Sequence, residues 1–130
     1  MARILVAEDD PSVRELVTRM IQASGHQVRA VVDGAFALEA LGEEEFDLLV
    51  TDIVMPRLDG IALALKLGKS HPDLPILMMT GYAHERQRAH DLDVLVHRVL
   101  TKPFTLDQFR IALADALSGS VTERGCAAWA

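Results

Sequence analysis

The chain has 130 residues, of which half are apolar and a quarter are charged, so it fits one folded domain and lies outside the composition of disordered proteins. Its formal net charge of −6, without any cluster of lysine and arginine, excludes nucleic-acid binding by the usual electrostatic route. The single cysteine, Cys126, excludes a disulfide framework and a cysteine-based zinc site, and no apolar stretch approaches the roughly 18 residues of a membrane span, so we expect a cytoplasmic protein that does not enter a membrane.

Short apolar runs recur along the chain and predict five buried strands. The first run, ILVA, shows no alternation of polar and apolar residues, which is typical of a strand covered on both faces, as in a parallel sheet. The predicted strands cover residues 4–7, 28–32, 47–51, 75–79 and 98–101.

The segments between these runs predict helices. Asp10 before Pro11 is the pattern of an N-cap followed by proline at the first helical position, while Gly25 and Gly42 mark the expected ends of the first two helices. A third helix is predicted after Gly60, and the polar segment 84–91 predicts a fourth. The apolar positions with helical spacing that predict the first and the fifth helix are Val13, Leu16, Val17, Met20 and Ile21, and Leu106, Phe109, Leu113 and Leu117.

The alternation of strand and helix predicts an α/β fold. Its sheet is expected to be parallel and doubly wound, with right-handed crossovers and helices on both faces. Helical spacing ends near Ser118, so we expect one domain over residues 1–118 and a flexible C-terminal tail over residues 119–130. In such a sheet, functional residues gather outside the carboxyl ends of the strands.

Reactive side chains follow four of the five predicted strands, so chain order alone brings them to one edge of the sheet. They are Glu8, Asp9 and Asp10 after the first strand, Asp52 after the third, Thr80 after the fourth and Lys102 after the fifth. Singly, each has an ordinary structural interpretation: the acids as a helix cap, Asp52 and Thr80 as turn residues, and Lys102 as a surface lysine.

Together, these residue types suit the transfer of a phosphoryl group. Crowded carboxylates repel one another, and a magnesium ion relieves the repulsion because it prefers oxygen ligands and keeps positions for water and phosphate. Asp52 could then attack phosphorus and form an aspartyl phosphate, while Lys102 neutralises charge on the phosphoryl oxygens and Thr80 donates a hydrogen bond to them. The joint placement favours this interpretation over four unrelated ones.

The stretches EDD, DIVMPRLDG, MMTG and TKPF, in this order, resemble the receiver domain of two-component response regulators, the CheY-like family, over residues 3–118. The resemblance implies a flavodoxin-like, five-stranded sheet of order 2-1-3-4-5 with five helices on its two faces. It also implies a stand-alone receiver that takes phosphate from a histidine kinase or a histidine phosphotransfer protein and switches its affinity for a downstream protein target.

The resemblance assigns the phosphoacceptor and the magnesium ligands. Asp52 matches the phosphoacceptor. Asp9, five residues before Arg14, matches the direct ligand of Mg²⁺, and Glu8 matches the neighbouring acid that acts largely through water. Asp52 itself and the backbone carbonyl of Val54 would complete the protein ligands.

The resemblance also assigns the residues that respond to the phosphoryl group. Thr80 matches the switch hydroxyl, Gly81 the small residue that leaves room for it, and Lys102 the phosphate-binding lysine, followed by Pro103 at a position that is often cis. Val99 departs from the family pattern, because receiver domains commonly carry Tyr or Phe there. A switch that relies on rotation of an aromatic ring is therefore not expected in its usual form.

Two other functions stay open on the sequence. One is a phosphate-shuttling intermediate in a multistep relay. The other is a magnesium-dependent phosphatase of the dehalogenase type, which requires a DxD motif where this chain reads DIV from Asp52. The valine before TKPF and the tail are also similar to single-domain regulators of the CpdR type, a resemblance that implies control of substrate delivery to a Clp-type protease.

Overall fold

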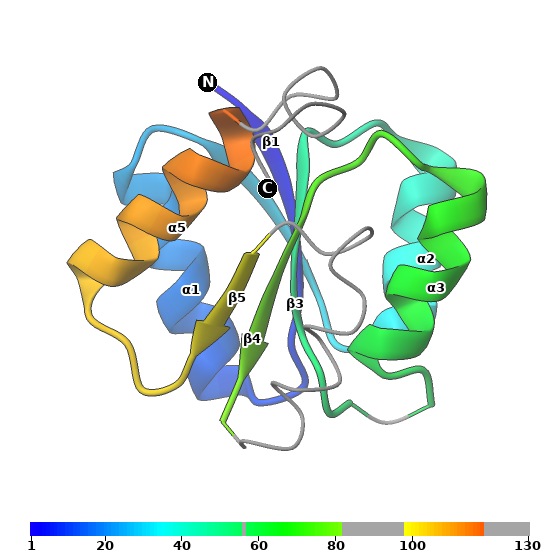
Figure 1. Ribbon diagram of the computed structural model, residues 1–130, viewed down its shortest axis with the longest axis horizontal. Helices are drawn as coiled ribbons and strands as arrows, with labels where there is room; N and C mark the ends of the chain where they lie inside the picture. The colour runs from blue at the N-terminus through cyan, green and yellow to red at the C-terminus, as the bar shows by residue number, and fades with distance from the viewer. Residues whose placement is uncertain (56, 82–97, 119–130) are drawn as a thin grey trace, which may run out of the picture.

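The five predicted strands form a parallel sheet in the order β2-β1-β3-β4-β5 (Figure 1), which confirms the predicted flavodoxin-like arrangement. The computed structural model describes residues 1–55, 57–81 and 98–118. The strands are β1 (Arg3–Ala7), β2 (Gln27–Val31), β3 (Leu48–Asp52), β4 (Ile76–Thr80) and β5 (Arg98–Thr101). The described helices are α1 (Pro11–Ala23), α2 (Gly34–Glu43), α3 (Gly60–Ser70) and α5 (Leu106–Ser118).

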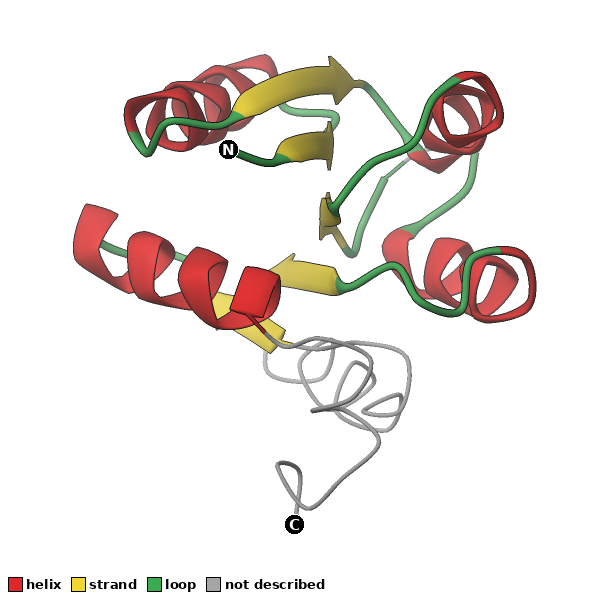
Figure 2. Ribbon diagram, turned by 90° about the horizontal axis from the view of Figure 1, so that it is seen from above, coloured by secondary structure: helices red, strands yellow, loops and turns green. Residues whose placement is uncertain are grey.

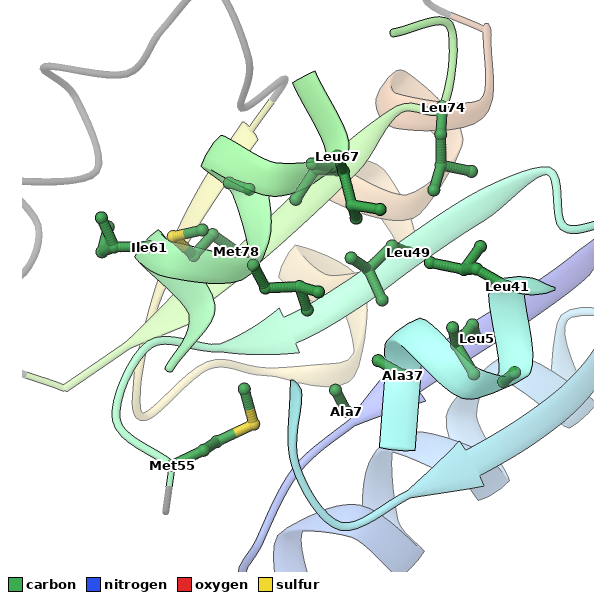
Figure 3. Packing of buried hydrophobic residues seen from close by; sticks show 14 of the residues in the cluster. Leu5, Ala7, Ala37, Leu41, Leu49, Met55, Ile61, Leu67, Leu74 and Met78 are labelled. Atoms are coloured by element: carbon green, nitrogen blue, oxygen red, sulfur yellow. The ribbon is translucent and has the colours of Figure 1, made fainter. Parts of the chain in front are cut away.

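The helices cover the sheet on two faces, with α1 and α5 on one face and α2 and α3 on the other (Figures 1 and 2). Strand β1 shows how the sequence serves both: Leu5 packs in the cluster on the α2 and α3 side, whereas its neighbours Ile4 and Val6 pack in the cluster on the α1 and α5 side. Figure 3 shows the first of these clusters, which Leu49 of β3 and Leu67 of α3 share. The runs that form β1, β3 and β4 are therefore buried on both faces, as the sequence predicts. The prediction is wrong for β2, a strand at the edge of the sheet that contains no buried residue.

The described residues contain four helices, not the predicted five, and the helix predicted over residues 84–91 lies outside the described part of the chain. Leu16 and Leu106, which are among the apolar positions that predict α1 and α5, do lie in these helices but are 53% and 48% exposed. The buried stripe of α1 runs through Val17, Met20 and Ile21, and Leu16 lies at its edge. None of the described helices is long and apolar enough to cross a membrane.

Aspartates begin three of the helices. The carboxylate of Asp10 accepts the Ser12 N–H at 2.9 Å, and Pro11 is the first residue of α1, as predicted. Asp33 and Asp59 cap α2 and α3 in the same way, through the N–H groups three residues on.

The two predicted helix ends have different outcomes. Gly25 follows α1 and has a φ of +89°, a conformation that favours glycine, so this prediction is confirmed. The end predicted at Gly42 is wrong, because α2 continues to Glu43 and is capped by Glu44, whose N–H donates to the carbonyl of Ala40.

The carboxyl edge of the sheet carries the candidate side chains. Asp52 is the last residue of β3 and Thr80 is the last residue of β4, while Glu8 and Lys102 directly follow β1 and β5. Since these strands are parallel, all four residues start from the same edge, as the chain order predicts.

Candidate functional site

Three carboxylates meet at this edge. Glu8, Asp9 and Asp52 each offer an oxygen, and these oxygens lie within 4.8 Å of one another. Glu8 is fully buried and Asp52 is 9% exposed, whereas Asp9 is exposed to solvent. The cluster is thus anchored in the protein on one side and open to water on the other, which suits a hydrated divalent cation.

Lys102 joins two of these carboxylates. Its Nζ donates to Oε1 of Glu8 and to Oδ2 of Asp52, both at 3.1 Å, and the Lys102 side chain is only 26% exposed. Burial by itself would lower the pKa of Lys102, but the charges of Asp52 and Glu8 outweigh burial and raise it above the ordinary value. The ammonium group therefore stays protonated beside the two acids.

Glu8 has an unusual pKa because of its position. Burial is the main cause, and the hydrogen bond and charge of Asp52 add to it, whereas the charge of Lys102 acts in the opposite direction; together they raise the pKa of Glu8 to about 7. Near neutral pH the carboxyl group of Glu8 is therefore partly protonated. A divalent cation bound at the cluster would favour its charged form.

Backbone contacts fix the first two acids. The guanidinium of Arg14 donates to the backbone carbonyls of Glu8 and Asp9 at 2.9 and 3.4 Å. The N–H of Asp10 donates to Oε2 of Glu8 at 3.2 Å, while the Asp10 carboxylate caps α1. Because the carboxylate of Asp10 is engaged at the start of α1, it is not part of the three-carboxylate cluster, in agreement with its predicted role as a cap. These contacts of Arg14 were not predicted from the sequence, in which Arg14 was used only to identify Asp9 as the magnesium ligand.

Asp52 is held by its own backbone. Its Oδ1 accepts the N–H of Ile53 at 2.9 Å, and its Oδ2 accepts the bond from Lys102. Gly60 packs against the same backbone, since a Cβ atom built at Gly60 would lie 2.2 Å from the carbonyl oxygen of Asp52. Sequence reasoning placed Gly60 only as a helix start and missed this close approach, for which its single signal was the DG pair.

Thr80 is buried at the end of β4, and the carbonyl of Thr80 accepts the N–H of Lys102 at 2.7 Å. A Cβ atom built at Gly81 would meet nothing within 4 Å, so there is open space at this residue. Val99 is partly buried and packs against the cluster on the α2 and α3 side. The Lys102–Pro103 peptide bond is cis, as the family pattern predicts.

The predicted ligand Val54 differs from the buried residues of the site in its exposure. It is in the loop that follows β3, and its side chain is exposed. Its predicted role concerns the backbone carbonyl, which makes the course of this loop important for the site. The structure thus gathers Glu8, Asp9, Asp52 and Lys102 directly, with Thr80 at the next strand end.

Comparisons with known proteins agree with this geometry. The family model described as "Response regulator receiver domain" matches residues 4–114. The chain is 42% identical over 106 residues to the response regulator receiver protein CpdR of Brucella abortus, an alignment that covers 82% of this chain and 88% of that protein. It is 40% identical over 106 residues to the response regulator MprA of Mycobacterium ulcerans, across 82% of this chain but only 46% of MprA. The chain therefore spans about half the length of MprA.

A solved structure supports the same relationship. The chain matches the response regulator protein TrrA of Thermotoga maritima, in complex with Mg²⁺ and BeF, with a TM-score of 0.82 and 30% sequence identity. The match covers 90% of this chain and all of TrrA.

Proposed function

The chain belongs to the family of response regulator receiver domains, and on that premise we propose that Asp52 accepts a phosphoryl group from a histidine kinase or a histidine phosphotransfer protein. As a receiver, it is a signalling protein of a two-component phosphorelay. The observation that carries the proposal is the lysine that bridges two carboxylates: Lys102 holds Asp52 and Glu8 at 3.1 Å each, beside a third carboxylate, Asp9.

The proposed reaction moves one phosphoryl group. An oxygen of the Asp52 carboxylate forms a bond to phosphorus as the bond from phosphorus to the donor's imidazole nitrogen breaks, and the electron pair of that bond stays with the imidazole. The Lys102 ammonium lies within hydrogen-bond distance of the attacking carboxylate, so it can move onto the phosphoryl oxygens without a change of fold. The Thr80 hydroxyl supplies a further donor.

The residues of the site fit a magnesium ion. Carboxylate oxygens are the ligands that this cation prefers, three of them lie within 4.8 Å, and the exposure of Asp9 leaves room for water. The ligands would be Glu8 through water, Asp9, Asp52 and the carbonyl of Val54. When bound, the cation neutralises charge on the phosphoryl oxygens. The same groups would assist hydrolysis of the aspartyl phosphate, and so return the receiver to its resting state.

The output we propose is a change in affinity for another protein. Thr80 would move toward the phosphoryl group into the space beside Gly81, and this movement would alter the surface that follows β4. Val99 would transmit the change by packing, since it has no ring to rotate. We propose that residues 1–118 act as a cytoplasmic receiver; the tail predicted over residues 119–130 lies outside the described part of the chain. Control of Clp-type protease delivery stays a prediction.

The phosphoacceptor is tested by intact mass after incubation with acetyl phosphate and Mg²⁺. The wild type is expected to gain one phosphoryl group, and Asp52→Asn, which keeps the shape but removes the nucleophile, is expected to gain none. Asp73→Asn changes an exposed aspartate in the loop before β4, away from the carboxyl ends of the strands, and serves as the control. Full phosphorylation of Asp52→Asn would contradict the proposal.

A second experiment separates the switch from the relay. The phosphorylated protein is mixed with a histidine phosphotransfer protein, and the label is followed. Transfer onward would identify a shuttle, and retention until hydrolysis a switch. The phosphatase alternative has no support among the matches reported above, which are receivers and response regulators.

A further inference from the structure

An ion pair ties the loop after β3 to the start of α2. Both Nε and Nη2 of Arg57 lie 2.8 Å from Oδ2 of Asp33, whose side chain is only 3% exposed. The guanidinium also lies over the ring of Phe36, 4.7 Å from its centroid. The other oxygen of Asp33 accepts the N–H of Phe36 at 3.0 Å, so one carboxylate both caps α2 and holds the loop.

The backbone conformation of Arg57 is unusual for a residue with a side chain. Arg57 has a φ of +67°, in the left-handed region that glycine and asparagine adopt most readily. The Cβ atom of a residue other than glycine is unfavourable in this conformation, and the contacts with Asp33 and Phe36 offset that cost. Glycine would adopt this φ more easily, but it could not form the ion pair with Asp33.

The pair acts on a loop that is fastened at other points. The N–H of Gly34 donates to the carbonyl of Leu58 at 3.1 Å, and the N–H of Gly60 donates to the carbonyl of Ile53 at 2.7 Å. Met55 is buried and belongs to the cluster on the α2 and α3 side (Figure 3). Between these points lies Val54, the exposed residue whose carbonyl is the proposed magnesium ligand. The course of the loop therefore decides where that carbonyl stands.

We propose that Asp33 and Arg57 are positioning residues for the phosphorylation site: their ion pair holds the loop that carries Val54 against α2 and thereby sets the magnesium affinity of the site. This inference rests on the proposed function, because it assumes that the carboxylate cluster binds Mg²⁺. Neither residue touches the reacting atoms. Their effect reaches the site through the backbone from Arg57 to Asp52.

The main test compares Arg57→Gly with the wild type. Glycine accepts the positive φ, so the variant removes the ion pair without adding backbone strain. We expect the dissociation constant for Mg²⁺, from an NMR titration, to rise about tenfold, the lower end of what outer partners of metal ligands contribute. Phosphorylation by acetyl phosphate is expected to slow at low Mg²⁺ and to recover at saturating Mg²⁺. Arg57→Lys, which keeps the charge, is expected to recover part of the affinity.

Two further variants separate positioning from stability. Asp33→Asn keeps an oxygen to cap α2 but loses the charge, and its effect on Mg²⁺ affinity is expected not to add to that of Arg57→Gly, because both remove one pair. Arg29→Ala removes an ion pair with Glu43 and Glu44 that has no link to the loop, and it is expected to leave Mg²⁺ affinity unchanged. In metal-free protein, Arg57→Gly is expected to speed hydrogen exchange at the N–H of Gly60, while Arg29→Ala is not.

Each result has one meaning. Unchanged Mg²⁺ affinity in Arg57→Gly, with a loss of stability similar to that of Arg29→Ala, would show that the pair only stabilises the fold and would overturn the inference. Wild-type protein that neither binds Mg²⁺ nor gains a phosphoryl group would overturn the proposed function, and this inference with it.

Discussion

The ammonium group of Lys102 reaches the carboxylate of Asp52 across an entire strand: their Nζ and Oδ2 atoms are 3.1 Å apart, yet β4 lies between β3 and β5. Only a long side chain spans that gap. Lys102 directly follows β5, so the pairing of β5 with β4 positions the lysine at the site. This arrangement makes Lys102 the residue whose change should be most informative.

Replacing Lys102 by methionine keeps most of the length but removes the charge. Phosphorylation by acetyl phosphate is expected to slow about a hundredfold, the usual loss when one preorganised electrostatic donor is removed. The pKa of Glu8 is expected to rise above its value of about 7, because the charge of Lys102 lowers it in the wild type. Carbon NMR of the Glu8 carboxyl group measures the second effect. Lys102→Arg, which keeps the charge, serves as the control, and an unchanged pKa in Lys102→Met would contradict the prediction.

The raised pKa of Glu8 predicts a pH-dependent stability in the absence of metal. The pKa rises from 4.5 to about 7 on folding, so the folded state holds more protons between these values. The stabilisation from this group is therefore fully present below pH 4.5 and is lost as the pH rises through 7. Glu8→Gln imitates the protonated group, and we expect it to resemble the wild type at pH 5 and to be more stable at pH 8, by at most about 3 kcal/mol.

Urea unfolding in the presence of EDTA measures this difference. Glu15→Gln on the surface of α1 is the control, and it is expected to change the free energy of unfolding equally at both pH values. The same pattern in Glu8→Gln would show that burial of Glu8 does not control its protonation.

The two adjacent aspartates are expected to separate into a ligand and a cap. Asp9→Ala should weaken Mg²⁺ binding strongly, because it removes one of three clustered carboxylates, and should leave stability nearly unchanged. Asp10→Ala should cost about 1 kcal/mol of stability through loss of the α1 cap and should change Mg²⁺ binding little. A metal titration and a urea melt of each variant decide the matter. Equal losses of affinity would remove the distinction.

The sequence predicts most of this site because its signals are local. Asp52, Thr80 and Lys102 each follow an apolar run, and the parallel order of the strands then brings them to one edge. The helix caps are local as well, and Asp10 is predicted correctly from Asp-Pro alone. The spacing does not show where the buried face of a helix ends: Leu16 fits the helical spacing of α1 and is nevertheless 53% exposed.

The parts that could not be predicted are contacts between loops. Arg57 and Asp33 are 24 residues apart, and neither an arginine in a turn nor an aspartate before a helix indicates its partner. The contact of Gly60 with the backbone of Asp52 is of the same kind, because a glycine after an aspartate is ordinary turn chemistry until the neighbouring strand is in place.

Gly60 provides a sharp test of that contact. In Gly60→Ala, the added methyl group would lie 2.2 Å from the carbonyl oxygen of Asp52 and 3.0 Å from the Cα of Ile53, both backbone atoms that cannot rotate away. The first turn of α3 or the end of β3 must therefore shift, and we expect a loss of about 1–3 kcal/mol in the free energy of unfolding. A shift of β3 would also displace Asp52, so phosphorylation by acetyl phosphate is expected to slow in the folded variant.

Gly42→Ala is the matched control, because Gly42 lies in α2 with nothing within 4 Å of its added Cβ. There alanine is expected to stabilise the protein by about 0.5–1 kcal/mol. Urea unfolding and phosphorylation rates are measured for both variants, and we expect Gly60→Ala to be less stable and Gly42→Ala more stable than the wild type. Equal stability of the two variants would show that the backbone around Gly60 accommodates the added methyl group without loss of free energy.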